Sequence, residues 1–249
     1  MSADSRALPQ IIALGGHSMT SNEEDVTLSR YLLDQVPAEH PRVCFLSQGS
    51  GEDAFYIANF YRHFLELNAQ PSDLSVFRPH TADVATFLLD QDIIYVGGGN
   101  TKSMLALWRE WDVDKVLRQG WQQGTLLSGV SAGAICWFDQ GLTDSIPGSL
   151  TALQCLGFLA GSCSPHYDGE AERRPSYHRL ISDGKMAEGY GIDDNAALHF
   201  VGCEPPRVVA ARPGAAAYRV EPTPSGISES KLNASIPLSL ENGGSHKTL

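Results

Sequence analysis

The sequence predicts an α/β fold, a three-layer sandwich in which helices cover both faces of a mostly parallel central sheet. In the first half of the chain, short apolar or β-branched runs alternate with longer segments of helical periodicity. The expected strands are apolar almost throughout, which is typical of parallel strands buried on both faces. The 249 residues, 42% of them hydrophobic, can build one packed core. We therefore expect a single α/β domain over residues 1–249, with flexible ends at 1–9 and 242–249.

The first expected strand, 10–14, ends at Gly15-Gly16, and the helix after it, 23–36, has Ser21 or Asn22 as its N-cap. The other elements of this half are strands at 42–47, 74–77, 92–96 and 124–130, and helices at 53–67, 83–89 and 101–111. The second half is richer in glycine and proline and predicts short strands at 196–201, 207–211 and 217–220. These later strands are expected to form an antiparallel edge or a side hairpin.

Charge and composition exclude several classes of partner. The 18 basic and 29 acidic residues give a formal net charge of −11, whereas a nucleic-acid partner needs a basic surface. The polar N-terminal segment has no apolar core of a signal peptide, and no stretch approaches the roughly 20 apolar residues of a membrane helix. Five cysteines without a C-x-x-C pair fit a reducing compartment. We expect a cytoplasmic protein, a monomer or homodimer, without nucleic-acid or membrane partners.

The strongest motif is G-x-S-x-G at 129–133, which follows an apolar strand directly and precedes a helical segment. This is the context of a nucleophile elbow, a sharp strand-to-helix turn that exposes its central residue above the sheet. Gly129 and Gly133 let the backbone pack closely around the turn, and Ser131 becomes a candidate nucleophile. The N–H of Ala132, at the start of the helix, can face a developing oxyanion.

A second glycine-rich segment, 97–100, ends the strand at 92–96. Its spacing matches neither a dinucleotide-binding fingerprint nor a P-loop. Glycine backbone N–H groups at this edge of a parallel sheet can instead approach a carbonyl oxygen closely. Gly98 and Gly99 are therefore candidates for the second wall of an oxyanion hole.

A nucleophilic serine also needs a base and an orienting acid. His166, in the segment 164–168, is the candidate base, and His17, in the loop after the first strand, is the alternative. Asp194, Asp168 and Asp144 all lie in turns and are the candidate acids. The residues alone leave the choice among these three open.

Four motifs in this order, 97–100 (GGGN), 131–134 (SAGA), 165–166 (PH) and 191–194 (GIDD), together resemble the peptidase E family of serine peptidases. That family includes cyanophycinase and has the class I glutamine amidotransferase-like fold. The resemblance spans roughly residues 10 to 220 and implies Ser131 as nucleophile and His166 as general base. It ranks Asp194 first among the acids.

The resemblance further implies hydrolysis of small peptides, including dipeptides with an N-terminal aspartate, whose carboxylate Arg173 would hold beside Asn100. The segment around Arg173 departs from the aspartyl dipeptidases in length and composition. An isopeptidase or amidase of the cyanophycinase type, and a non-catalytic binding protein that keeps the fold, are the alternative functions. The Cys and His residues lack metal-ligand spacing, so we expect neither a metal nor an organic cofactor.

Overall fold

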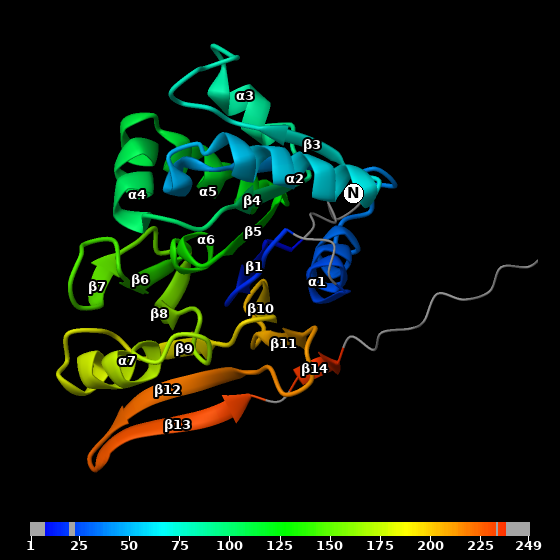
Figure 1. The fold of residues 1–249 in the computed structure, drawn as a ribbon. Coiled ribbons are helices and arrows are strands. Elements are labelled where there is room, and N and C mark those ends of the chain that lie inside the picture. The colour runs from blue at the N-terminus through cyan, green and yellow to red at the C-terminus, as the bar shows by residue number, and fades with distance from the viewer. Residues whose placement is uncertain (1–7, 20–22, 233, 238–249) are drawn as a thin grey trace, which may run out of the picture.

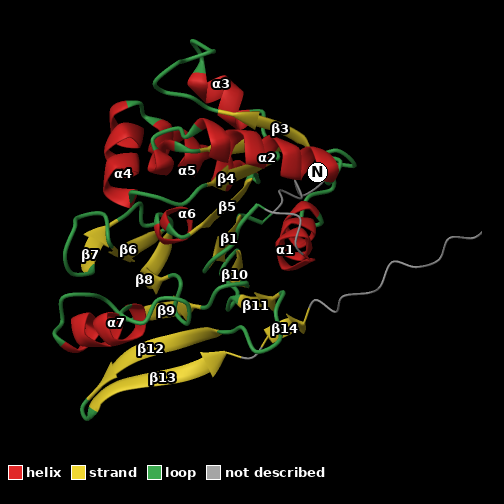
Figure 2. Cartoon of the chain, viewed as in Figure 1, coloured by secondary structure: helices red, strands yellow, loops and turns green. Residues whose placement is uncertain are grey.

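The computed structural model describes residues 8–19, 23–232 and 234–237, and within these residues the strands form two sheets (Figures 1 and 2). The larger sheet contains β1 (Gln10–Leu14), β2 (Arg42–Leu46), β3 (Gln70–Asp73), β4 (Ile93–Val96), β5 (Leu126–Val130), β10 (Ala196–Val201), β11 (Arg207–Ala210) and β14 (Ala234–Pro237). Its eight strands are arranged in the order β14-β11-β10-β1-β5-β4-β2-β3. The pairs from β1 to β3 are all parallel, whereas β10 is antiparallel to both of its neighbours.

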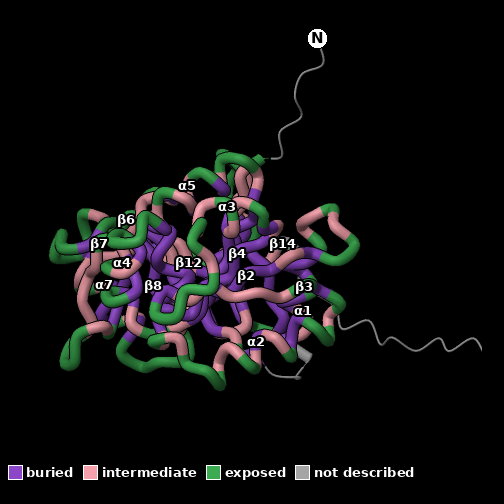
Figure 3. Tube along the Cα trace, turned by 90° about the horizontal axis from the view of Figure 1, so that it is seen from above, coloured by how far each residue is buried: buried purple, intermediate pink, exposed green. Residues whose placement is uncertain are grey.

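Helices cover both faces of this sheet, so the predicted α/β sandwich with a mostly parallel sheet is confirmed. Neighbouring residues of one strand point to opposite faces: Ile11 and Ala13 join one apolar core, and Ile12 and Leu14 join the other. The first core includes buried residues of α3 (Val84–Leu89), α4 (Thr101–Glu110) and α5 (Val113–Gln123), and the second includes those of α1 (Glu23–Leu33) and α2 (Ala54–Glu66). Figure 3 shows the buried strands running through the middle of the molecule.

Two sequence predictions in this half are wrong. The strand expected at 74–77 lies at β3, four residues earlier, because β3 is a polar edge strand and shows no apolar pattern. The apolar run follows it as a loop, in which Leu74 and Val76 are buried. The helix α5 was not predicted, although its buried residues Val113, Leu117 and Gly120 have helical spacing. The expected N-cap at Ser21 or Asn22 and the ends 1–7 and 242–249 lie outside the described residues.

The second sheet was not predicted from the sequence. Its strands are β6 (Phe138–Thr143), β7 (Thr151–Gln154), β8 (Leu159–Ser164), β9 (Gly189–Ile192), β12 (Ala217–Thr223) and β13 (Gly226–Leu232). They lie in the order β13-β12-β9-β8-β6-β7, and α7 (Arg173–Ser182) packs on them through a small core that includes Tyr177, Ile181 and Val220. Both expected arrangements of the late strands occur, since β10 and β11 extend the large sheet as an antiparallel edge and β12–β13 form a hairpin beside α7 (Figure 1). No helix among the described residues is long and apolar enough to cross a membrane.

Candidate active site

Ser131 lies at the strained turn between β5 and the short helix α6 (Ala132–Ile135). Its backbone has φ 56° and ψ −111°, a region that residues other than glycine rarely occupy. A Cβ on Gly129 would lie 2.5 Å from the Gly133 carbonyl oxygen, and a Cβ on Gly133 would collide with the Val96 carbonyl. Both glycines of the motif are therefore needed for close packing of the turn, as the sequence predicts for a nucleophile elbow.

The end of β1 holds three segments of the site through consecutive backbone carbonyl groups, at residues 14–16. The Ser131 N–H donates to the first at 3.3 Å, and the His166 N–H donates to the second at 3.2 Å. The Asn195 N–H, next to Asp194, donates to the third at 2.9 Å. One strand end thus positions the expected nucleophile, base and acid together, although they come from elements far apart in the sequence.

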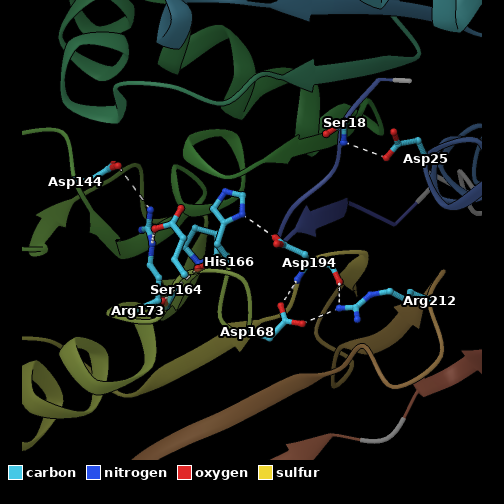
Figure 4. A network of polar contacts seen from close by, with 11 residues as sticks. Ser18, Asp25, Asp144, Ser164, His166, Asp168, Arg173, Asp194 and Arg212 are labelled. Atoms are coloured by element: carbon cyan, nitrogen blue, oxygen red, sulfur yellow. Dashed lines mark hydrogen bonds and ion pairs between the residues drawn. The ribbon is translucent and has the colours of Figure 1, made fainter. Parts of the chain in front are cut away.

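His166 and Asp194 are in direct contact (Figure 4). The His166 Nδ1 lies 2.7 Å from the Asp194 Oδ1, and the two side chains are 23% and 36% exposed. The hydrogen bond from His166 lowers the pKa of Asp194 below its usual value. Because an ionised carboxylate only accepts hydrogen bonds, Nδ1 is the donor of this pair, and in the neutral imidazole Nε2 is then an acceptor.

The other two candidate acids have different partners. Asp168 accepts the backbone N–H of Asp194 at 2.8 Å and forms an ion pair with Arg212 at 2.7 Å, so it supports the turn that carries Asp194 (Figure 4). Asp144 lies 3.8 Å from Arg173 Nη2, and its side chain is mostly exposed. Of the three candidate acids, Asp194 is the one that the structure brings to His166.

His17, the alternative base, belongs to a separate buried network. Its Nδ1 lies 3.1 Å from Asp25, and its Nε2 lies 3.2 Å from the Ser29 hydroxyl. The His17 side chain is 1% exposed. Its Nε2 is engaged by Ser29, and the buried ring is not part of the lining of the cavity beside Ser131, so the structure does not bring His17 to the expected nucleophile.

The glycine-rich segment lies directly beside the nucleophile. A Cβ on Gly98 would be 3.4 Å from the Ser131 Cβ and 3.9 Å from its Oγ. The Gly98 N–H donates to the Tyr56 hydroxyl at 3.3 Å. Gly99 has φ 129°, and a Cβ there would collide with the Gly49 carbonyl, so the close approach of these two loops requires glycine.

A cavity of about 260 Å³ opens beside Ser131. Its lining comprises Gly99, Asn100, Ser131, Asp144, Ser145, Glu170 and Arg173. Arg173 is buried, with its Nε 2.7 Å from Glu170 and its Nη1 donating to the Leu142 carbonyl at 3.1 Å. Its Nη2 lies 3.8 Å from the Asp144 carboxylate, which exceeds hydrogen-bond distance.

Asn100 uses both ends of its amide to build the cavity wall. Its Oδ1 accepts the Ser103 N–H at 2.9 Å as the N-cap of α4, and its Nδ2 donates to the Ser145 carbonyl at 2.8 Å. The side chain therefore joins the helix to the loop after β6. Asn100 lies at the cavity as the sequence predicts.

Sequence reasoning missed two glycines that fit around the acid. A Cβ on Gly16 would collide with the Asp194 Oδ1 and lie 2.9 Å from the His166 Nδ1, and a Cβ on Gly169 would collide with the Asp194 Oδ2. The available signal was the Gly15-Gly16 pair at the end of the strand next to the elbow strand. Tyr56 was also missed, and it has no local signature because it lies within an ordinary amphipathic helix.

Comparisons with known proteins identify the family of the chain. The sequence model of peptidase family S51 matches residues 11–205. The uncharacterized peptidase YgaJ of Bacillus subtilis is 48% identical over 225 residues, which cover 90% of this chain and 97% of that protein. The uncharacterized peptidase Lmo0363 of Listeria monocytogenes is 24% identical over 61% of this chain and 78% of its own length.

Solved structures share the fold at low sequence identity. A peptidase from an acI-B1 actinobacterium superposes with a TM-score of 0.69 at 16% identity, covering 93% of this chain and 96% of its own. A protein of the peptidase E type from Listeria monocytogenes superposes with a TM-score of 0.61 at 18% identity, covering 91% of this chain and all of its own. With the family match and the 48% identical relative, the chain belongs to peptidase family S51, the peptidase E family, and is a serine-type peptidase.

Proposed function

We propose that the protein hydrolyses small peptides through an acyl-enzyme formed on Ser131, with His166 as general base and Asp194 as its orienting acid. The observation that carries this proposal is the shared anchorage of the three segments on residues 14–16, with the His166 Nδ1 2.7 Å from the Asp194 Oδ1. An imidazole held by a carboxylate in this way is the arrangement that activates a serine hydroxyl.

In the proposed reaction, the Ser131 Oγ attacks the scissile carbonyl while Nε2 of His166 takes the hydroxyl proton. The same imidazole then protonates the leaving amine, and water releases the acyl group by the reverse sequence. Asp194 keeps the proton on Nδ1 and stabilises the imidazolium. The acyl-enzyme is formed and broken without any group from outside the chain except substrate and water.

We propose an oxyanion hole made of Ala132, Gly98 and Gly99. The Ala132 N–H lies at the first position of α6, where helix geometry provides no intrahelical acceptor. Gly98 forms the close wall beside Ser131. Because the Gly98 N–H already donates to the Tyr56 hydroxyl, we propose the N–H of Gly99 as the second donor. Loss of one such donor costs about 3 kcal/mol in transition-state stabilisation.

For the substrate, we propose dipeptides with an N-terminal aspartate. The support is the buried guanidinium of Arg173 in the same cavity as Ser131, with Nη2 outside hydrogen-bond distance of Asp144. A guanidinium can bind a carboxylate through parallel hydrogen bonds. Asn100 holds the Ser145 loop and thereby shapes the space that the substrate occupies.

The decisive test is Ser131→Ala measured against Ser145→Ala, which removes a second hydroxyl from the same cavity. We expect Ser131→Ala to abolish hydrolysis and labelling by a fluorophosphonate probe, because it removes the attacking atom. Ser145→Ala should retain both. Hydrolysis by a correctly folded Ser131→Ala variant would refute the proposal, and failure of the wild-type protein to hydrolyse or label would favour a non-catalytic binding protein.

A panel of α-aspartyl, β-aspartyl and neutral N-terminal dipeptides tests the substrate proposal. We expect the highest kcat/KM for the α-aspartyl series. Preference for β-aspartyl linkages would instead favour an isopeptidase of the cyanophycinase type. Equal rates with neutral dipeptides would contradict a role for Arg173 in binding the substrate side chain.

We further propose a cytoplasmic location. All five cysteines fall within the described residues, and all five are unpaired thiols. Unpaired thiols are typical of a reducing compartment. Fractionation of the native host, followed by detection of the protein, tests this location.

A further inference from the structure

Two of the proposed functional residues are each followed by a residue that contacts the C-terminal hairpin. Tyr167 follows His166, and Arg174 follows Arg173. His166 and Arg173 contact Asp194 and the Ser131 cavity, respectively. Tyr167 and Arg174 instead contact β12 and β13. Because each is bonded directly to His166 or Arg173, a displacement of the hairpin would move these two site residues as well.

Glu229, on β13, is the common partner of these contacts. Its Oε2 accepts the Tyr167 hydroxyl at 2.7 Å and the His178 Nε2–H at 2.8 Å, and it lies 3.4 Å from the Arg174 Nε. The Glu229 side chain is 22% exposed. One carboxylate thus joins the His166 segment to two positions of α7, the helix that begins at Arg173.

Ring contacts reinforce the same connection. The Arg174 guanidinium lies over two tyrosine rings, 4.7 Å from the centroid of Tyr167 and 4.6 Å from that of Tyr218 on β12. Cation–π contacts of this kind favour a fixed, partly dehydrated cation. Arg174 thus contacts one carboxylate, that of Glu229, and two aromatic rings. Glu229 and Tyr218 belong to the hairpin, and Tyr167 does not.

Tyr167 is held at its other end by the backbone. Its N–H donates to the Ile192 carbonyl at 3.1 Å, and its ring packs over Gly191, where a Cβ would lie 2.7 Å from ring atoms. Burial, reinforced by Glu229, raises the pKa of the Tyr167 hydroxyl, so it stays protonated and remains a donor at neutral pH. The preceding residue, His166, has φ 49°, a strained conformation that persists only when its neighbours hold it.

We infer that Glu229 is a positioning residue of the active site, through which the hairpin β12–β13 sets the orientation of His166 and of Arg173. The inference rests on the proposed function of these two residues. The hairpin lies beyond residues 11–205, the part of the chain that matches the family. Glu229 would therefore support the proposed site from outside the segment that the family model matches.

The test compares Glu229→Gln with Glu221→Gln. Both variants remove one carboxylate from the hairpin, but Glu221 pairs with Arg219 and touches none of Tyr167, His178 or Arg174. For Glu229→Gln we expect kcat/KM for α-aspartyl dipeptides to fall about tenfold, because small misplacements of catalytic groups have large effects on rate. Displacement of Arg173 should raise KM. Displacement of His166 should lower the rate of fluorophosphonate labelling and change the pH profile of that rate.

Glu221→Gln should keep these constants within about twofold of wild type, the range expected where no site group moves. Tyr167→Phe, which keeps the ring and removes only the hydroxyl, should lower the labelling rate in the same direction and serves if Glu229→Gln fails to fold. A folded Glu229→Gln variant with wild-type kcat, KM and labelling profile would overturn the inference. If the wild-type protein cleaves no dipeptide, the substrate proposal has failed, and the labelling rates of the same variants still decide the role of Glu229.

Discussion

The two sheets contribute to the site in different ways. The eight-stranded sheet supplies Ser131 after β5 and the glycine-rich segment after β4, and both depend on local backbone geometry. The six-stranded sheet supplies His166 after β8 and Asp194 after β9, and both depend on contacts with other elements. The surroundings of Ser131, the proposed nucleophile, are therefore encoded in a few consecutive residues, whereas the contact between His166 and Asp194, the proposed base and acid, forms only where the sheets meet.

The contact between the sheets is made by the end of β1. Residues 14–16 belong to the large sheet or follow it directly, yet their carbonyl groups receive N–H groups from Ser131 and from the His166 and Asn195 segments. Gly16 also leaves the space that the Asp194 carboxylate occupies. The comparison indicates that substitutions on the six-stranded side should affect orientation of the base, and substitutions at the β1 end should affect both sides.

The largest effect is expected for Asp194→Asn. An amide cannot hold the Nδ1–H tautomer as the carboxylate does, and the same change in another Ser-His-Asp enzyme lowers kcat about ten-thousandfold. We expect a loss of at least about a thousandfold here. Steady-state kcat on an α-aspartyl dipeptide measures it, with Asp144→Asn as the matched control. A comparable loss in Asp144→Asn would show that the acid comes from the loop after β6.

The pH dependence of stability should have opposite signs on the two sides. His199, on β10, bonds the Tyr31 hydroxyl through Nδ1 at 2.8 Å and Gln10 through Nε2 at 2.9 Å. Burial lowers its pKa from 6.5 to about 4. As the pH falls, the unfolded chain therefore takes up a proton at this histidine before the native protein does. The contribution of His199 to the free energy of unfolding is complete above pH 6.5 and is lost as the pH falls toward about 4.

Asp193, at the end of β9, behaves in the opposite way. Burial, reinforced by Asp168, raises its pKa from 3.8 to about 6. The native state therefore holds a proton that the unfolded chain has released. Its contribution is present below pH 3.8 and is lost as the pH rises toward about 6.

Denaturant unfolding of His199→Gln between pH 7 and 4 separates the two contributions. The difference in unfolding free energy between wild type and this variant should shrink by about 3 kcal/mol as the pH falls, the linkage value of the pKa shift. Asp193→Asn should give a difference of opposite slope. A pH-independent difference for His199→Gln would mean that this histidine is not held neutral.

Gly16→Ala tests the junction itself. A Cβ there collides with the Asp194 Oδ1 and approaches the His166 Nδ1, so the base and acid must separate. We expect kcat to fall about a hundredfold, the effect of roughly an ångström of misplacement. Gly120→Ala, within α5, meets neighbours no closer than 3.3 Å and should keep its activity. Full activity in Gly16→Ala would contradict the role of the β1 end.

The smallest effect is expected on substrate binding. Arg173→Ala removes the buried guanidinium and should lower kcat/KM for α-aspartyl dipeptides by about ten- to a hundredfold, because a hydrogen bond to a charged group is lost. The change should lie chiefly in KM. Neutral dipeptides should be less affected. Arg179→Ala, on the same helix with only a 3.5 Å contact to Ser176, is the control. Equal losses with aspartyl and neutral substrates would assign Arg173 a structural role.

Much of the large sheet and the elbow could be predicted from the sequence. Strands buried on both faces need continuous apolar residues, and the turn at Ser131 needs glycine at 129 and 133, so both leave a local pattern. The six-stranded sheet leaves little apolar pattern because several of its strands are largely exposed, as in β7, whose residues are all partly or fully exposed, and in β13. The local sequence left His17 as the alternative to His166, and the family resemblance favoured His166.

The sequence by itself determined the alternation of strands and helices in the first half, the sharp turn at Ser131 and the three aspartates proposed as candidate acids. Only the tertiary structure decided that Asp194 contacts His166, and that Asp168 accepts the backbone N–H of Asp194. It also decided that Glu229, on a hairpin distant in the sequence, contacts the residue after His166. The physical reason is the range of the forces involved. Backbone strain and apolar periodicity act between neighbours in the chain, whereas a hydrogen bond between side chains depends on the distance between two atoms that only the folded chain brings together.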